Sequence, residues 1–220
     1  KLIINQEQKL RAKKLIDLII KQKLSKYNHQ PIFTPSIGFR TSKVLVIDQT
    51  YGDMSITKGM ANEQTFKIML KKAIEDNPNA DIIIKTHPDV ISGAKGYFSD
   101  IKPFDNVYIY TEEINPICLL QYVDKVYACS SQMGFEAMMC GKETHIFGLP
   151  FYAGWGASID YQNCTRRQNK RSVEEIFYIT YILYTKYIDY KKNIPCEIED
   201  TINNLINLRE KYFSEKGIKL

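Results

Sequence analysis

The sequence contains no apolar run near the roughly 20 residues that a helix needs to cross a membrane. Its first residues do not form a signal peptide either, because Arg11, Lys13 and Lys14 interrupt any apolar core there. These two absences predict a cytoplasmic protein. Attachment to the inner face of the inner membrane stays open, because surface contact needs no spanning helix.

Paired cysteines are also missing. The five cysteines stand singly at Cys118, Cys129, Cys140, Cys164 and Cys196, without a CxxC spacing. This pattern argues against a disulfide framework and against a zinc knuckle. The three histidines, His29, His87 and His145, show no metal-ligand spacing. We expect neither a metal nor a cofactor.

Several nucleotide and hydrolase signatures are absent. The chain has no GxGxxG dinucleotide fingerprint, no GxxxxGK[ST] phosphate loop and no GxSxG nucleophile elbow. The net charge of +5 suits an anionic substrate or lipid surface but is too small to indicate nucleic acid. The one dense basic stretch, residues 166–171, is interpreted either as a solvated loop or as an anion or membrane contact.

What is present is a regular alternation of strand and helix patterns. Short β-branched runs predict strands at 44–48, 80–85, 106–110, 125–129 and 144–148, and apolar spacing predicts helices at 6–23, 62–77, from 115, and at 133–140. This order is typical of an α/β fold with a Rossmann-like parallel sheet and helices on both faces. After Trp155 the chain is predicted to become helical, with a start at Ser172, a Tyr-rich packing helix over 176–187 and a last helix over 197–212.

Three parts follow from this pattern. Residues 1–42 are predicted to form a helix and a linker, residues 43–165 a Rossmann-like ligand-binding domain, and residues 166–220 a helical segment packed on it. In an open α/β sheet, ligands bind beyond the carboxyl ends of the strands. The residues directly after the predicted strands are therefore the candidates for a site.

Ser130 and Ser131 stand between a predicted strand and a predicted helix. Free backbone N–H groups and serine hydroxyls favour an anion there, although one of the two serines could merely cap the helix. The next residue, Gln132, belongs to the same cluster, and Glu136 lies one turn further on. The Glu136 carboxylate could accept hydrogen bonds from ribose hydroxyls or face solvent.

Two further clusters follow other strands. His87-Pro88 comes just after a strand, with Lys85 two residues earlier, and both basic side chains could meet a phosphate. The loop DQTYGDMS holds Asp48 and Asp53, and a carboxylate there could act as base or nucleophile towards a sugar's anomeric carbon. We rank Asp53 above Asp48, which could instead brace the loop.

Several long motifs occur together in one order: VLVIDQTYGDMSI, IIIKTHPDV, SGAKGYF and VYACSSQMGFEAMMCGKETHIFGLPFYAGWG. In these motifs, and in RSVEEIFYITYILYTKYID, the chain resembles the capsule polysaccharide biosynthesis family, specifically KpsC-type retaining β-Kdo glycosyltransferases. The resemblance runs from about residue 25 to residue 199.

The resemblance implies transfer of Kdo from CMP-Kdo to a lipid-linked glycan acceptor during capsular linker synthesis. It implies a GT-B-like enzyme of two Rossmann-type halves, of which this chain supplies strands for one, so we do not expect the chain to be active alone. It implies that Asp53 is the nucleophile and that His87, Ser130 and Ser131 hold the CMP phosphate. Gln132 and Glu136 would lie near the nucleoside. Lys85 or Arg40 is matched by charge to the sugar carboxylate.

Other interpretations stay open. A related CMP-sugar transferase, for example of sialyl type, would present the same phosphate site. A non-catalytic nucleotide-binding or assembly module of a capsule export complex would bind CMP without chemistry. The partners expected are a CMP-sugar donor, a lipid-linked acceptor, and the inner-membrane surface or capsule assembly proteins; nucleic acid is not among them.

Overall fold

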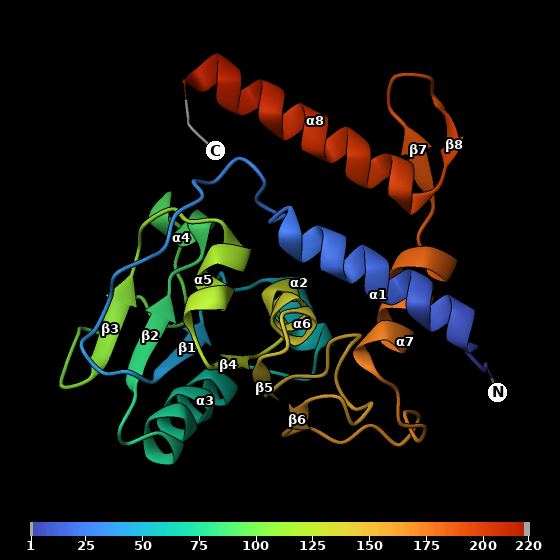
Figure 1. Ribbon diagram of the computed structural model, residues 1–220. Coiled ribbons are helices and arrows are strands. Elements are labelled where there is room, and N and C mark those ends of the chain that lie inside the picture. The colour runs from blue at the N-terminus through green and yellow to red at the C-terminus, as the bar shows by residue number, and fades with distance from the viewer. Residues whose placement is uncertain (1, 218–220) are drawn as a thin grey trace.

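The computed structural model describes residues 2–217, in which a six-stranded sheet forms the centre of the molecule (Figure 1). All its strand pairs are parallel. The strands are β1 (Lys43–Ile47), β2 (Asp81–Lys85), β3 (Val107–Tyr110), β4 (Lys125–Ala128), β5 (Glu143–Ile146) and β6 (Ile159–Asp160). Their order is β3-β2-β1-β4-β5-β6. The chain thus adds strands to one side of β1 and then switches to the other side, which creates a crevice between β1 and β4.

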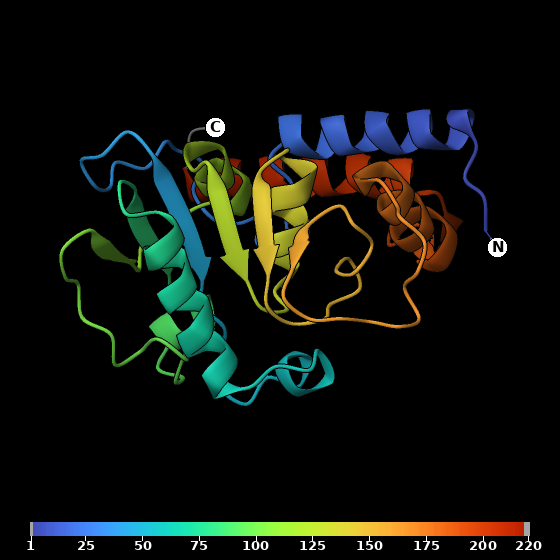
Figure 2. The same cartoon turned by 90° about the horizontal axis from the view of Figure 1, so that it is seen from below.

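Helices cover both faces of the sheet, as predicted (Figure 2). Side chains alternate along each strand, so Val44 and Val46 pack into one core while Leu45 and Ile47 pack into the other. The first core is covered by α3 (Glu63–Asp76). The second is covered by α5 (Pro116–Tyr122) and α6 (Gln132–Met139).

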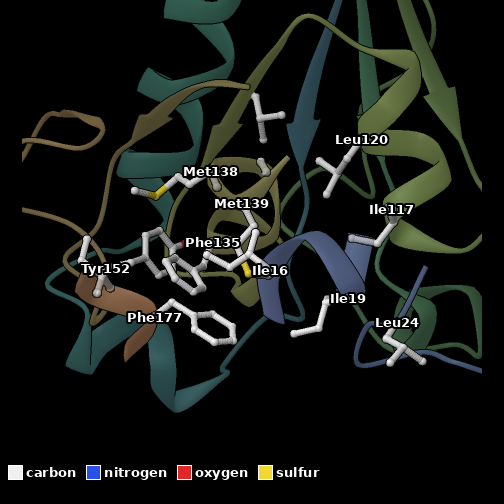
Figure 3. Close-up of a cluster of buried hydrophobic side chains, with 14 of the residues drawn as sticks. Ile16, Ile19, Leu24, Ile117, Leu120, Phe135, Met138, Met139, Tyr152 and Phe177 are labelled. Atoms are coloured by element: carbon white, nitrogen blue, oxygen red, sulfur yellow. The ribbon is translucent and has the colours of Figure 1, made fainter. Parts of the chain in front are cut away.

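An outer layer of helices packs on the second core. It consists of α1 (Gln6–Lys21), α7 (Val173–Phe177), the π-helix η1 (Tyr178–Tyr184) and α8 (Ile198–Lys216). Ile16 of α1 and Phe177 of α7 meet Phe135 of α6 in this core (Figure 3). The Arg11 guanidinium bonds the carboxylates of Glu197 and Glu199, so α1 and the start of α8 lie together.

Two short helices fall in segments for which no helix was predicted. They are α2 (Met54–Lys58) and α4 (Pro88–Ile91). Each begins at a side chain that accepts a backbone N–H two residues on, Asp53 for α2 and His87 for α4. The loops after β1 and β2 therefore each lead into a short helix whose first turn is stabilised by a side-chain cap.

The prediction for the C-terminal third is partly wrong. Ser172 does begin a helix with a capping box, but residues 156–171 are loop with only the two residues of β6. The Tyr-rich helix ends at Tyr184, and a hairpin follows, β7 (Tyr187–Asp189) and β8 (Ile194–Cys196). Its turn has two signals that the sequence reading missed, the Asp189 carboxylate accepting two backbone N–H groups and Asn193 at positive φ.

The basic stretch at 166–171 is not a free loop. The Arg167 guanidinium donates to the carbonyl oxygens of Pro150 and Ala153, and that of Arg171 donates to Leu2 O. These two arginines therefore fix the 150s loop and the N-terminal segment. Within residues 2–217, the longest apolar helical segments fall short of what a membrane crossing requires.

Candidate functional site

A cavity of about 270 Å³ opens at the carboxyl ends of β1, β2 and β4, beside the point where the strand order switches. Its volume is close to the lower end of the range for ligand pockets. The site residues predicted at the strand ends all line it: Asp48, Asp53, Lys85, His87, Pro88, Ser130, Ser131, Gln132 and Glu136. The prediction that three loops distant along the chain meet at one edge of the sheet is confirmed.

The two serines after β4 have different environments. Ser131 is the N-cap of α6, since its Oγ accepts the Met133 N–H at 3.3 Å, and its carbonyl accepts the Tyr152 hydroxyl. Gly134 has no Cβ because one would strike that Tyr152 hydroxyl. The capping interpretation therefore applies to Ser131, and Ser130 is the serine whose hydroxyl is available at the cavity.

Ser130 is held by Gln49, the residue after Asp48. The Gln49 Oε1 accepts the Ser130 N–H at 3.0 Å, and its Nε2 donates to Ser130 Oγ at 3.1 Å. The Ser55 hydroxyl lies 3.2 Å from Ser130 Oγ. Gly59 packs against this group, and a Cβ there would lie 3.2 Å from Ser130 Cβ. Hydroxyls from two loops thus converge on one point of the cavity wall.

Asp48 is buried, with 2% of its surface exposed, and braces a neighbouring loop. Its Oδ1 accepts the backbone N–H groups of Gln49, Tyr97 and Phe98. Burial raises the pKa of this carboxyl to about 6, although the three N–H groups oppose the change. Gly96 makes room for the carboxylate, because a Cβ there would strike Asp48 Oδ2.

Asp53 differs from Asp48 in being exposed at the cavity mouth. Its Oδ1 accepts the Ser55 N–H at 2.8 Å and so caps α2. Within residues 2–217 its Oδ2 has no hydrogen-bond partner. Gly52 precedes it at φ 83°, which lets the chain turn and present the carboxylate at the mouth.

His87 is half-buried in the cavity wall, in the loop that follows β2. Its Nδ1 accepts the Asp89 N–H at 3.2 Å, which leaves the proton of the neutral ring on Nε2. Burial lowers the pKa of His87, so the neutral ring dominates at neutral pH. The Nε2 lies 3.3 Å from the Tyr27 hydroxyl at the cavity wall. His87 is therefore a hydrogen-bond donor in this site.

Lys85 supplies a buried cation. Its Nζ donates to Glu112 O at 3.0 Å and lies 5.4 Å from the centre of the Tyr110 ring. Burial lowers the pKa of Lys85 to about 8, so the ammonium form still predominates at neutral pH. A bound anion would stabilise this charge.

Glu136 faces the cavity from α6 and is 3% exposed, so the solvent-facing alternative is wrong. Burial raises the pKa of this carboxyl to about 7, against the opposing effect of Lys26. Gln132, one turn earlier, is exposed at the rim and donates to the Tyr181 hydroxyl at 3.4 Å.

One side of the cavity is formed by a segment that was not predicted to belong to the site. Lys26, Tyr27 and Gln30 come from the loop after α1, which carried no strand-end signal. Arg40, one of the two candidates for a second anionic group, lies at the opposite end of the sheet. Its guanidinium donates to the carbonyl oxygens of Pro78 and Ala80, just before β2 begins.

In chemical terms the cavity offers hydroxyl, imidazole and ammonium donors beside an exposed carboxylate. This set suits a phosphorylated ligand with a reactive carbon near Asp53. Within the described chain, no His, Cys, Asp and Glu side chains are grouped so that they could hold a metal ion.

A family model described as capsule polysaccharide biosynthesis protein matches residues 34–192, which include β1 to β7 and most of the cavity wall. The chain belongs to this family. The match covers the part of the fold that carries the cavity rather than one isolated motif.

Individual relatives agree with the family. The capsule polysaccharide modification protein LipA of Neisseria meningitidis is 41% identical over 94% of this chain, and the lipopolysaccharide-processing protein LpsZ of Rhizobium meliloti is 36% identical over 89%. This chain spans 31% of LipA and 45% of LpsZ, less than half of either.

Solved structures show the same fold. A Thermosulfurimonas dismutans KpsC structure, described as a β Kdo 2,4 transferase, superposes with a TM-score of 0.86 at 44% identity. It covers 92% of this chain and 64% of the other. A second KpsC structure from that organism, a β Kdo 2,7 transferase, superposes at 0.70 with 28% identity, over 93% and 62% of the two chains. This capsule-family chain is therefore similar to Kdo transferases in both sequence and fold.

Proposed function

We propose that the chain is the CMP-sugar-binding half of a retaining Kdo transferase of the GT-B type, which acts on a lipid-linked acceptor in capsule synthesis. One observation carries the proposal: phosphate-type donors and an exposed carboxylate line the same cavity at the switch point of the sheet. The two KpsC structures, described as β Kdo transferases, support the choice of sugar.

In this proposal the donor's phosphate lies between His87 and Ser130. The His87 Nε2–H and the Ser130 hydroxyl donate to its oxygens, and the Lys85 ammonium balances its charge. Glu136 faces the ribose hydroxyls from α6, with Gln132 at the rim.

Asp53 is the proposed nucleophile because its Oδ2 is available at the mouth, whereas Asp48 is buried under the 96–98 loop. The Asp53 carboxylate forms a bond to the anomeric carbon as the bond from that carbon to the phosphate oxygen breaks. CMP leaves with the electron pair. An acceptor hydroxyl then attacks the same carbon, loses its proton and displaces the carboxylate, so two inversions give overall retention.

The test is transfer from CMP-Kdo by the protein that carries this chain, with Asp53→Asn compared with the wild type. We expect the variant to lose transfer by a factor of 1,000 or more, of the order seen when a catalytic nucleophile is removed. CMP affinity should stay close to wild type. Asp100→Asn, at a surface position that pairs with Lys95, is the matched control and should retain full transfer.

Mass spectrometry after incubation with CMP-Kdo should show a Kdo adduct on a peptide that contains Asp53. An adduct on another carboxylate would identify that residue, and not Asp53, as the nucleophile. Transfer from CMP-sialic acid but not from CMP-Kdo would show that the donor sugar is a sialic acid rather than Kdo. CMP binding without any adduct or transfer would show that the chain is a non-catalytic nucleotide-binding module.

A further inference from the structure

Gln30 is a buried polar side chain whose amide has no partner. Only 2% of the residue is exposed, and it lines the cavity from the segment that follows α1. Its backbone N–H bonds Tyr27 O, but its side chain makes no hydrogen bond within residues 2–217. In that part of the chain, Asp81 Oδ1 and Arg209 Nε are the side-chain atoms that are both fully enclosed and without a partner. The Gln30 amide atoms have no partner but are not fully enclosed, so they can be reached from the cavity.

The Gln30 amide gives none of its hydrogen bonds to the protein, so its donor and acceptor are both available to whatever fills the cavity. No local structural need explains it, since the loop around Gln30 is held by other bonds. Asn115 donates its backbone N–H to Pro31 O and its side-chain Nδ2 to Lys23 O, each at 2.8 Å. The amide is therefore free to serve a ligand.

The surroundings of Gln30 differ from those of the phosphate donors. The bonds from Asn115 place the segment against the start of α5, where Ile114, Pro116 and Leu119 line the cavity, with Met133 of α6 also on its wall. An apolar slot with one planar donor–acceptor pair suits a flat heteroaromatic ring. A sugar's hydroxyls would find few partners among these side chains.

We propose that Gln30 recognises the base of the nucleotide donor, by pairing with the edge of cytosine that carries the N3 acceptor and the N4 amino group. This inference rests on the proposed function, which supplies the CMP group. The Gln30 Nε2 donates to N3 and its Oε1 accepts from N4, the same two-bond pattern by which a glutamine amide reads adenine. The apolar slot covers the faces of the ring, and the phosphate reaches Ser130 and His87.

The test compares two ligands, CMP and ribose 5-phosphate, which lacks the base, by calorimetry on the wild type and on Gln30→Leu. We expect the wild type to bind CMP at least tenfold more tightly than ribose 5-phosphate. Gln30→Leu should remove most of that difference by weakening CMP alone. Ser130→Ala should instead weaken both ligands by a similar factor, because both carry the phosphate.

Thermal unfolding is a second measurement, and it distinguishes an amide that serves a ligand from one that stabilises the fold. Replacing an unpaired buried amide with an apolar side chain of similar size should leave the Tm of Gln30→Leu unchanged or raise it. A lower Tm together with equal weakening of both ligands would overturn the inference. So would a wild type that binds CMP no better than ribose 5-phosphate, or a variant that keeps its preference for CMP. A wild type that binds neither ligand would instead reject the proposed function itself.

Discussion

The Gln49 amide holds Ser130 by both its atoms, accepting the Ser130 N–H at 3.0 Å and donating to Ser130 Oγ at 3.1 Å. These bonds join the end of β1 to the end of β4 across the switch point of the sheet. Ser130 is thereby oriented before any ligand arrives. Groups fixed in advance lose little freedom on binding, which favours affinity.

Gln49→Glu should therefore weaken CMP binding at least tenfold. The new side chain keeps an acceptor for the Ser130 N–H but loses the donor to Ser130 Oγ, and it adds a negative charge beside the phosphate. Calorimetry would measure the change. Gln121→Glu, at an exposed position on α5 outside the cavity, should bind CMP as the wild type does.

His87→Ala should weaken CMP binding by about 1–3 kcal/mol, the range for a lost hydrogen bond to a charged group. His29→Ala is the control, because His29 lies near the Tyr27 ring but does not line the cavity. If the two variants bound CMP with equal affinity, His87 would not be a ligand of the phosphate.

CMP affinity should fall as the pH rises above about 8. In the free protein Lys85 has a pKa of about 8, so above that value it loses the positive charge that faces the anion. Lys85→Met should bind CMP more weakly at neutral pH and show no such fall. The measurement is CMP affinity from pH 6.5 to 9.5, and a wild-type curve that matches the variant's would exclude Lys85 from anion binding.

Asp48 should make the protein less stable as the pH rises from about 4 to 6. Its pKa is 3.8 in its ordinary state and about 6 when folded, so between these values the unfolded chain has released its proton while the folded chain retains it. Above pH 6 the full difference, about 3 kcal/mol, opposes folding.

Asp48→Asn keeps an oxygen for the N–H groups of Gln49, Tyr97 and Phe98 and carries no titrating proton. Relative to the wild type, its free energy of unfolding should therefore improve as the pH rises from 4 to 7. Urea unfolding at a series of pH values would measure this. A difference between the two proteins that does not change with pH would contradict the effect of burial on Asp48.

The local sequence pattern determined the sheet and the location of the site. Apolar β-branched runs at 44–47 and 82–84 can form little except buried strands, and their alternation with helices leaves a parallel arrangement as the stable one. Parallel strands place their carboxyl ends at one edge, so the clusters at Asp53, His87 and Ser130 had to share it.

The tertiary structure alone decided which of those side chains face the ligand and what closes the cavity around them. Asp48 and Asp53 are both acidic and five residues apart, but contact with the 96–98 loop buries one and leaves the other at the mouth. Gln30 lines the cavity only because α1 packs on the same core as α6, and the loop that follows α1 runs back to α5. Such contacts depend on packing between segments distant along the chain, and no periodicity within a segment records them.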